Sequence, residues 1–218
     1  VTGSGRVAHG ILEIMNLLDV QEVEPDEYLS KDFDYPVYVH LKGNNLYQHS
    51  TNKTYHRDHF HEHPEEYDCL FEQYCAHTDI LMNGIYWGTN VPRLFSMDSL
   101  KRPDFKIQTI ADITDDKHGS IPCNLGDATI QDPVYGVNKL SGQKTDPYLS
   151  DSVDIMAVGN LPNELPRDAS RYFGEQLIKY ILEDVRKGGS AIIERATILD
   201  KGKLTEPFEY LKDYASLE

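Results

Sequence analysis

Short apolar runs alternate with longer amphipathic stretches along most of the chain. We expect buried strands at the short runs, which occupy residues 20–23, 37–41, 79–86, 107–113 and 154–158. We expect helices where apolar residues recur at helical spacing, at residues 65–76 and 166–187, and a short polar helix at 96–100. Strands that alternate with helices predict an α/β fold, with a doubly wound and mostly parallel sheet.

A glycine-rich turn, Gly3-x-Gly5-x-x-Ala8, stands at the start of the chain. A helix should follow it, because apolar residues recur at helical spacing at Val7, Ile11, Ile14 and Leu18. This pattern joins the first strand of a dinucleotide-binding sheet to its first helix, whose N-terminus holds the pyrophosphate. Only Val1 and Thr2 precede the turn, so we expect the first strand to be truncated.

An acidic residue, Glu24, follows the glycines by about 20 residues, at the end of the second predicted strand. At that position a carboxylate would accept from the ribose hydroxyls of NAD and repel the 2′-phosphate of NADP. The sequence therefore favours NAD modestly. The alternative is a glycine turn without a ligand and a Glu24 that is simply exposed.

The net charge of −15 makes nucleic acid and anionic membrane surfaces poor partners. The chain contains no apolar run long enough to cross a membrane. Its three cysteines form no disulfide or zinc pattern, which favours a reducing compartment. We expect an intracellular protein, in the cytoplasm or in the mitochondrial matrix of a eukaryote.

Histidines are concentrated in the polar segment 25–64, which is longer than an ordinary connection and predicts an insertion. The alternation of His59, His61 and His63 would place three imidazoles on one face of a strand, a conceivable zinc site. No cysteine lies nearby and the segment has the composition of a loop. A solvated histidine-rich loop is therefore the favoured interpretation, and we expect no metal.

Two of the predicted strands end in candidate ligand segments: the run at 79–86 continues into a glycine-containing loop, with 83–87 as candidates, and Asp115 and Asp116 follow the run at 107–113. Ligands bind at the carboxyl ends of strands in an open parallel sheet, so both segments are candidates for the site. Asp116 could position the substrate or the nicotinamide ribose and support a cationic intermediate. Adjacent acids at a strand end are also common as helix caps and turns.

Taken together, these segments resemble the lysine–ketoglutarate reductase half of animal and plant aminoadipic semialdehyde synthase. A more distant similarity extends to fungal saccharopine dehydrogenases, alanine dehydrogenase and the NAD domain of transhydrogenase. The segments that carry the resemblance are 3–7, 23–25, 63–65, 83–87, 89–94, 112–113, 119–121 and 160–174.

The resemblance implies two Rossmann-type domains, the second of which returns through a long helix to the first. We therefore expect a dinucleotide-binding domain at 1–165, with 25–64 inserted, and a returning segment at 166–218. The resemblance also implies that a lysine and a histidine of the other domain act as acid and base. That domain is missing from this chain, so we expect the chain alone to be inactive.

Family site residues transfer to matching positions. Gly3, Gly5, Arg6 and Val7 match the pyrophosphate turn, and Glu24 the ribose acid. Ile85 and Tyr86 match a loop that lines the cofactor. Asp112, Ile113 and the catalytic candidate Asp116 match the strand end beside the reacting carbon, and Asn160 and Leu161 match a turn near the nicotinamide. The chain departs from the family at Lys117 and His118, where relatives have a smaller pair that includes glycine.

The implied activity is an oxidoreductase that uses NAD or NADP to join lysine to 2-oxoglutarate, forming saccharopine, or to reverse that reaction. The partners are then these small molecules, and a second copy of the chain is a further candidate. Two alternatives stay open at the sequence level. One is an amino-acid dehydrogenase similar to alanine dehydrogenase, and the other is a nucleotide-binding module without turnover.

Overall fold

The computed structural model describes residues 1–216 and divides the chain between Gly159 and Asn160 into two compact units. The first unit contains the glycine turn, all the larger sheets and the hydrophobic core. The second contains a series of short helices. The expected domain boundary, at residues 165 and 166, lies close to this division.

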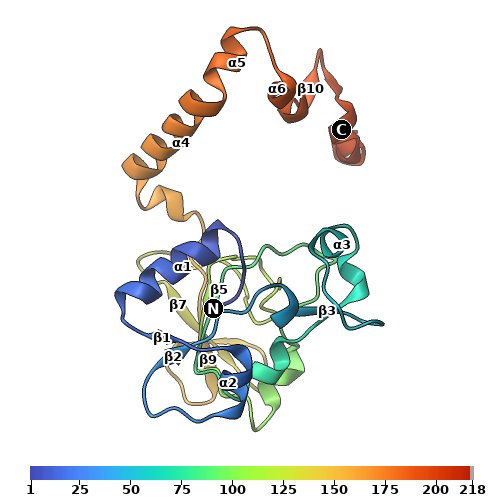
Figure 1. The fold of residues 1–218 in the computed structure, drawn as a ribbon. Coiled ribbons are helices and arrows are strands. Elements are labelled where there is room, and N and C mark those ends of the chain that lie inside the picture. The colour runs from blue at the N-terminus through green and yellow to red at the C-terminus, as the bar shows by residue number, and fades with distance from the viewer. Residues whose placement is uncertain (217–218) are drawn as a thin grey trace. The chain divides into compact units, whose positions relative to one another are not determined.

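A five-stranded sheet forms the centre of the first unit (Figure 1). Its strands, in spatial order, are β5 (Ile80–Asn83), β6 (Thr109–Asp112), β9 (Ser152–Met156), β7 (Val134–Asn138) and β8 (Lys144–Thr145). The first three are parallel, whereas β7 and β8 run antiparallel to their neighbours. The mixed α/β architecture agrees with a Rossmann-like fold. The antiparallel β7–β8 hairpin was not predicted.

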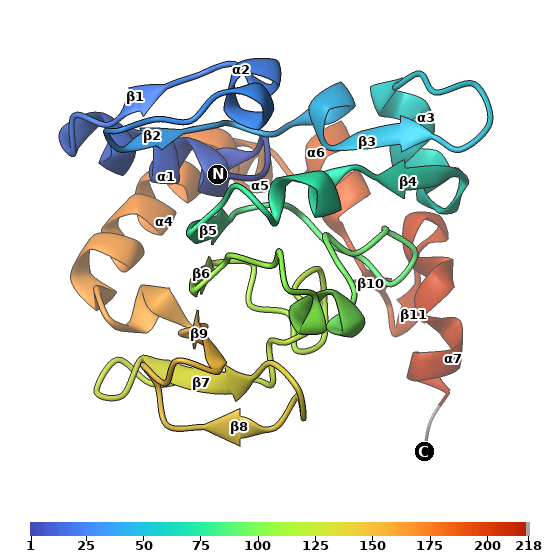
Figure 2. The same cartoon turned by 90° about the horizontal axis from the view of Figure 1, so that it is seen from below.

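Thr2 connects this sheet to a smaller parallel pair, β1 (Gln21–Glu22) and β2 (Val37–Tyr38). It forms parallel bridges to Asn83 on one side and to Leu41, beyond the end of β2, on the other. Figure 2 shows β1 and β2 at one edge of the arrangement and β7 and β8 at the opposite edge. The chain next to the glycine turn is thus the 37–41 segment, and β1 lies one strand further out.

Helix α1 (Arg6–Leu17) begins directly after the glycine turn, as predicted. Its buried face consists of Ala8, Ile11 and Met15. Of the apolar residues whose spacing predicted this helix, Ile11 is buried, whereas Val7, Ile14 and Leu18 are 45%, 53% and 60% exposed. The small side chain of Ala8 allows close contact between α1 and the sheet, and the helix therefore faces the sheet with the side that carries Ala8.

The segment after β1 is rich in short elements. In order, these are α2 (Pro25–Ser30), β2, η1 (Gly43–Asn45), β3 (Tyr47–His49), α3 (Arg57–Glu62), η2 (Pro64–Glu66), β4 (Tyr67–Cys69) and η3 (Phe71–Tyr74). The helix predicted at 65–76 is wrong: β4 pairs antiparallel with β3, between two 3-10 turns. The aromatic residues that suggested a helix are buried by this pairing, since Tyr67, Phe71 and Tyr74 all enter the core. The favoured interpretation of 59–63 as a loop is wrong in part, because His59 and His61 belong to α3, and the alternative of three histidines on one face of a strand is excluded for the same reason.

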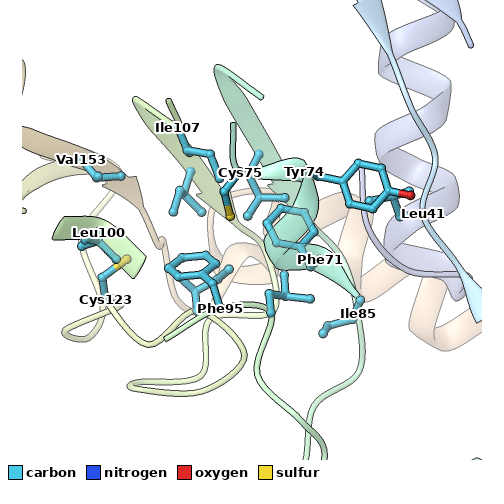
Figure 3. Close-up of a cluster of buried hydrophobic side chains, with 14 of the residues drawn as sticks. Leu41, Phe71, Tyr74, Cys75, Ile85, Phe95, Leu100, Ile107, Cys123 and Val153 are labelled. Carbon is cyan, nitrogen blue, oxygen red and sulfur yellow. The ribbon is translucent and has the colours of Figure 1, made fainter. Parts of the chain in front are cut away.

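The main core includes side chains of the five-stranded sheet and consists mostly of aromatic and branched residues. Phe71 and Phe95 lie near each other within it, and Figure 3 shows them with other members of this core, among them Leu100, Ile107, Cys123 and Val153. Leu100 comes from η4 (Met97–Lys101), a 3-10 turn where we predicted a helix. Ile110 and Ile155, on β6 and β9, are also fully buried.

The second unit consists of η5 (Leu161–Asn163), α4 (Pro166–Tyr180), α5 (Leu182–Arg186), α6 (Ala191–Ala196), β10 (Leu199–Asp200), β11 (Lys203–Leu204), η6 (Glu206–Leu211) and α7 (Lys212–Ala215). The helix predicted at 166–187 is present as two helices, interrupted at Ile181. Among residues 1–216, no helix is long and apolar enough to cross a membrane.

Candidate functional site

The two glycines of the turn have different surroundings. Gly3 has a φ of +110°, and a Cβ there would lie 2.7 Å from the carbonyl carbon of Gly84 and closer still to its oxygen. Only glycine fits that position. Around Gly5, by contrast, no atom of another segment lies within 4 Å of the place that a Cβ would occupy. The backbone at Gly5 is therefore open to a ligand.

This open backbone leads into the N-terminus of α1. Gly5 is the N-cap residue and has no side chain with which to cap the first N–H groups of the helix. The first turn contains no acidic residue, and Arg6 adds an exposed positive charge. Unpaired N–H groups, the helix dipole and a cation together favour an anion such as a phosphate. The residues present thus fit the pyrophosphate of a dinucleotide.

A buried polar network lies directly beneath the turn, centred on Asn83 at the end of β5. The Thr2 hydroxyl donates to Asn83 Oδ1 at 2.7 Å, and Asn83 Nδ2 donates to Asp112 Oδ1 at 2.8 Å and to Ser120 Oγ at 2.9 Å. Asn124 Nδ2 donates to the second oxygen of Asp112, also at 2.8 Å. The network ties the turn to the ends of β5 and β6 and to the loop that follows β6.

Asp112 belongs to this internal framework, since it is only 2% exposed. Burial raises the pKa of its carboxyl group, an effect that the amides of Asn124 and Asn83 oppose by donating to it. Its neighbour Ile113 donates its N–H to the Asn83 carbonyl and packs against the apolar cluster of Ile11, Met15 and Tyr38. Asp112 and Ile113, which were predicted to lie at the site, thus support this edge of the sheet from inside the fold.

His40 holds the glycine turn from the other side. Its Nε2 lies 2.7 Å from the Gly3 carbonyl oxygen, and the ring is buried. Burial lowers the pKa of His40, which favours a neutral ring that donates from Nε2. The Gly3 N–H also donates to the Leu41 carbonyl at 3.0 Å. The next residue, Lys42, therefore lies beside the turn. Its side chain is exposed.

Glu24 does not follow the strand next to the glycine turn. It is the exposed N-cap residue of α2, at the end of β1. Because residues 37–41 intervene between β1 and Thr2, Glu24 is separated from the turn by one strand. Its role as the ribose acid stays a prediction.

Asp116 lies in the loop after β6, near the same edge of the sheet. Its carbonyl accepts from Gly119 N–H at 2.8 Å, and no helix begins in this loop, so Asp116 is not a helix cap. Its side chain is half-buried, and within residues 1–216 no group donates a hydrogen bond to its carboxyl oxygens. Burial raises its pKa. The side chain is therefore available to a ligand.

The loop around Asp116 adopts left-handed backbone at two residues that are not glycine. Asp115 has a φ of 56° and His118 a φ of 51°. His118 also approaches the Pro122 carbonyl oxygen through Nδ1, at 3.2 Å. Lys117 and His118 are the pair for which the resemblance implies a smaller pair that includes glycine, and the loop forms with histidine there at some conformational cost.

The loop after β5 packs against the loop after β6. Thr114 donates its hydroxyl to the Ile85 carbonyl at 2.6 Å, and the Ile85 side chain is buried. Arg93 donates to the Gly119 carbonyl at 3.1 Å and lies over the Trp87 ring. Tyr86, between them, is 85% exposed. Of the two predicted loop residues, Tyr86 is thus free to contact a ligand and Ile85 supports the loop.

Asn160 and Leu161 begin the second unit. Asn160 has a left-handed backbone, with a φ of 53°, and is the N-cap residue of η5. Both side chains are exposed. The structure therefore assembles the glycine turn, Tyr86 and Asp116 at one edge of the first unit, and the predicted roles of Asn160 and Leu161 stay predictions.

A cavity of about 670 Å³ lies elsewhere in the first unit. Its lining includes Leu18 at the end of α1 and Val37 and Ile80 at the starts of β2 and β5. The glycine turn follows the carboxyl end of its strand instead. The cavity is therefore separate from the candidate site.

Sequence reasoning did not find three of the residues that shape the site. Thr2 lies within the glycine motif but was not expected to bond to Asn83. His40 is a polar residue within an apolar run, and this pattern could have indicated a buried hydrogen bond. Asn124 gave no signal, because its partner Asp112 becomes its neighbour only in the folded chain.

Comparison with known proteins gives several relatives for this chain. The alpha-aminoadipic semialdehyde synthase of Arabidopsis thaliana is 30% identical over 234 residues, 96% of this chain and 22% of the relative. The mitochondrial alpha-aminoadipic semialdehyde synthase of Mus musculus is 28% identical over 242 residues, 97% of this chain and 26% of the relative. Its homologues are these synthases and saccharopine dehydrogenases.

The dehydrogenase similarity covers a shorter stretch. The saccharopine dehydrogenase [NAD(+), L-lysine-forming] of Candida glabrata is 29% identical over 106 residues, 47% of this chain and 26% of the relative. The chain therefore spans about a quarter of the length of these curated relatives. No known family model matches it. The homology confirms the expected resemblance.

Proposed function

We propose that this chain is the dinucleotide-binding part of an oxidoreductase that forms or cleaves saccharopine. Lysine and 2-oxoglutarate are the proposed substrates, and NADH or NADPH the reductant. The names of the relatives support the substrates and, for the Candida glabrata relative, the cofactor. The observation that carries the proposal is the open backbone at Gly5, which leads into an uncapped helix N-terminus.

The chain's own residues have separable tasks in this proposal. The N–H groups at the start of α1 hold the pyrophosphate, and His40 and the Asn83 network keep the turn in place from below. The bound cofactor supplies the hydride chemistry. Asp116 orients the substrate or supports positive charge on it, because its carboxylate is half-buried and without a donor among residues 1–216.

Gly5→Ala should weaken dinucleotide binding and leave the fold intact. The new methyl group meets no protein atom within 4 Å, so the melting temperature should change little. The same methyl group would stand where the pyrophosphate approaches the backbone. We expect at least about tenfold weaker binding of NAD(P)H, a loss of roughly 1.4 kcal/mol, measured by calorimetry on the full-length protein.

Gly10→Ala is the matched control. Gly10 lies in α1, also has no atom within 4 Å of its Cβ position, and is one helical turn beyond the anion site. Alanine should stabilise the helix by roughly 0.8 kcal/mol and leave binding unchanged. Equal dinucleotide affinities for wild type and Gly5→Ala would contradict the proposed site.

We further propose that Lys42 contacts the adenosine ribose and that it tolerates a 2′-phosphate there. Lys42 follows the segment that pairs with the glycine turn, whereas Glu24 is one strand away. Lys42→Ala should weaken NADPH binding by about fivefold relative to NADH, the range of an exposed ion pair. Glu24→Ala is the comparison. If this variant alone changes the affinity for NADH, Glu24 and not Lys42 contacts the adenosine ribose.

The mitochondrial matrix is the proposed location if the protein is eukaryotic, as the names of the mammalian relatives indicate for those enzymes. A saccharopine-forming assay with the full-length protein distinguishes the proposed reaction from that of a dehydrogenase for small amino acids. Oxidation of NAD(P)H should require lysine and 2-oxoglutarate together. Oxidation with pyruvate and ammonia instead would contradict the proposal.

A further inference from the structure

A cluster of histidine and glutamate side chains lies on the first unit away from the glycine turn. It comprises His49 and the group of residues His59, His63, Glu65 and Glu66, and we refer to it as the His49–Glu66 cluster. Figure 2 shows the elements that carry it, with α3 beside β3 and β4 and far from β7 and β8. The cluster stands where the 50–66 excursion closes, since Ser50 N–H donates to the Glu66 carbonyl.

The ligand atoms of the cluster have the spacing of a metal site. Glu66 Oε2 lies 3.2 Å from His49 Nε2 and 3.9 Å from His59 Nε2. His49, His59 and Glu66 each offer one ligand atom within 4.8 Å of the other two. Metal bonds of 2.0–2.1 Å in a tetrahedron place ligand atoms about 3.4 Å apart. The exposed fractions of 18%, 43% and 48% leave these side chains room for such small adjustments and an entry path for an ion.

One ring nitrogen of His59 has a protein partner and the other faces Glu66. His59 Nδ1 lies 3.2 Å from the Tyr67 hydroxyl, which in turn lies 3.3 Å from the His56 carbonyl oxygen. His59 Nε2 lies 3.9 Å from Glu66 Oε2, a separation close to that of two ligand atoms on one ion. An ion bound at Nε2, with Nδ1–H donating to a fixed partner, is the usual arrangement of a metal-binding histidine.

A second set of ligands shares Glu66 with the first. His63, Glu65 and Glu66 also bring one ligand atom each within 4.8 Å of one another. His59 and His63 are four residues apart, and their ring centroids are 5.1 Å apart. His59 lies in α3 and His63 is its C-cap residue, so both rings lie at the same end of this helix. The pattern of His59, His63 and Glu66 was not recognised in the sequence, where only the alternation with His61 was considered.

We propose that the His49–Glu66 cluster binds one zinc ion through His49, His59 and Glu66. Nitrogen and carboxylate donors without cysteine suit Zn²⁺, whereas Mg²⁺ and Ca²⁺ prefer oxygen ligands alone. Binding through His49 Nε2 moves its proton to Nδ1 and releases the contact with Thr51 N–H. The ion joins α3 to the β3–β4 hairpin and closes the 50–66 excursion. The proposal is independent of the oxidoreductase function.

Zinc titration of the full-length protein, without a polyhistidine tag and after chelator treatment, tests this site. We expect one zinc ion per chain by calorimetry, a higher melting temperature on zinc addition and no competition from Mg²⁺. His59→Ala and the isosteric Glu66→Gln should each lower zinc affinity by at least about tenfold. Far-ultraviolet circular dichroism without metal verifies that both variants fold.

His61→Ala is the matched control, because His61 lies on the same helix but in neither ligand set. It should bind zinc as the wild type does. The proposal is overturned if the wild type binds no zinc, if His59→Ala and Glu66→Gln bind it normally, or if His61→Ala loses it equally. Since the measurements are metal binding and stability, they do not depend on whether the chain takes part in saccharopine metabolism.

Discussion

Replacing Asn83 by aspartate should destabilise the protein by more than about 3 kcal/mol at neutral pH. Asn83 is fully buried, and its amide nitrogen donates to Asp112 and Ser120. In the variant, two carboxyl groups would face each other at about 2.8 Å, the distance of the hydrogen bond that is lost. Two buried carboxylates cannot both be ionised there, and one must take up a proton.

The loss of stability should depend on pH with a definite sign. The shared proton raises the pKa of the pair in the folded variant above its unfolded value, so the folded state binds more protons. Stability relative to wild type should then recover as the pH falls and worsen as it rises. Denaturant unfolding at several pH values measures this. Asn52→Asp, in an exposed turn where the side-chain oxygen only accepts, is the control and should change stability by at most about 0.5 kcal/mol. If the difference in unfolding free energy between the variant and the wild type does not change with pH, the network does not hold an ionised Asp112.

Asp116→Ala in the full-length protein should lower turnover by at least about tenfold and change dinucleotide affinity by no more than about threefold. The carboxyl group is half-buried, at the same edge of the sheet as the glycine turn. Among residues 1–216, no group donates a hydrogen bond to it. Its loss should therefore leave the melting temperature nearly unchanged. Burial raises the pKa of Asp116 above its ordinary value of 3.8, so a rate that needs the carboxylate should rise with pH through that raised pKa.

Asp116→Asn and Asp116→Glu separate charge from shape. The asparagine variant should lose turnover and the acid limb of the pH–rate profile, and the glutamate variant should recover part of both. Asp132→Ala removes an exposed loop carboxylate of the same unit and should behave as wild type. A normal turnover number with a lower melting temperature for Asp116→Ala would mean that the residue only shapes its turn.

Local patterns predicted much of the fold. The glycine turn, the helix after it and the runs at 37–41, 107–113 and 154–158 all correspond to observed elements, because burial of a continuous apolar run leaves few alternatives. The helix at 65–76 failed because apolar residues at 67, 70, 71 and 74 fit both a helix and a buried strand between 3-10 turns. Pairing with β3, which decides between them, is a long-range property.

The candidate site was predictable only where a motif is local. Gly3, Gly5 and Ala8 follow from spacing alone. The neighbour of the first strand does not, because either 20–23 or 37–41 could pair with Thr2, and this choice decides whether Glu24 or Lys42 stands beside the turn. The His49–Glu66 cluster likewise needs β3, α3 and η2 to be brought together before its ligands become neighbours.

The close contact between α1 and Gly84, the residue after β5, limits which substitutions this sequence can accept. A Cβ at Gly84 would lie 3.1 Å from the Ala8 backbone nitrogen and 3.0 Å from Ile11 Cδ1, so the pair is already in close contact without a side chain at Gly84. A larger residue at position 8 could not be compensated by a smaller one at position 84, since none exists. In a mutational library, substitutions at these two positions would therefore have no mutual rescue, and Ala8 could be exchanged only for glycine.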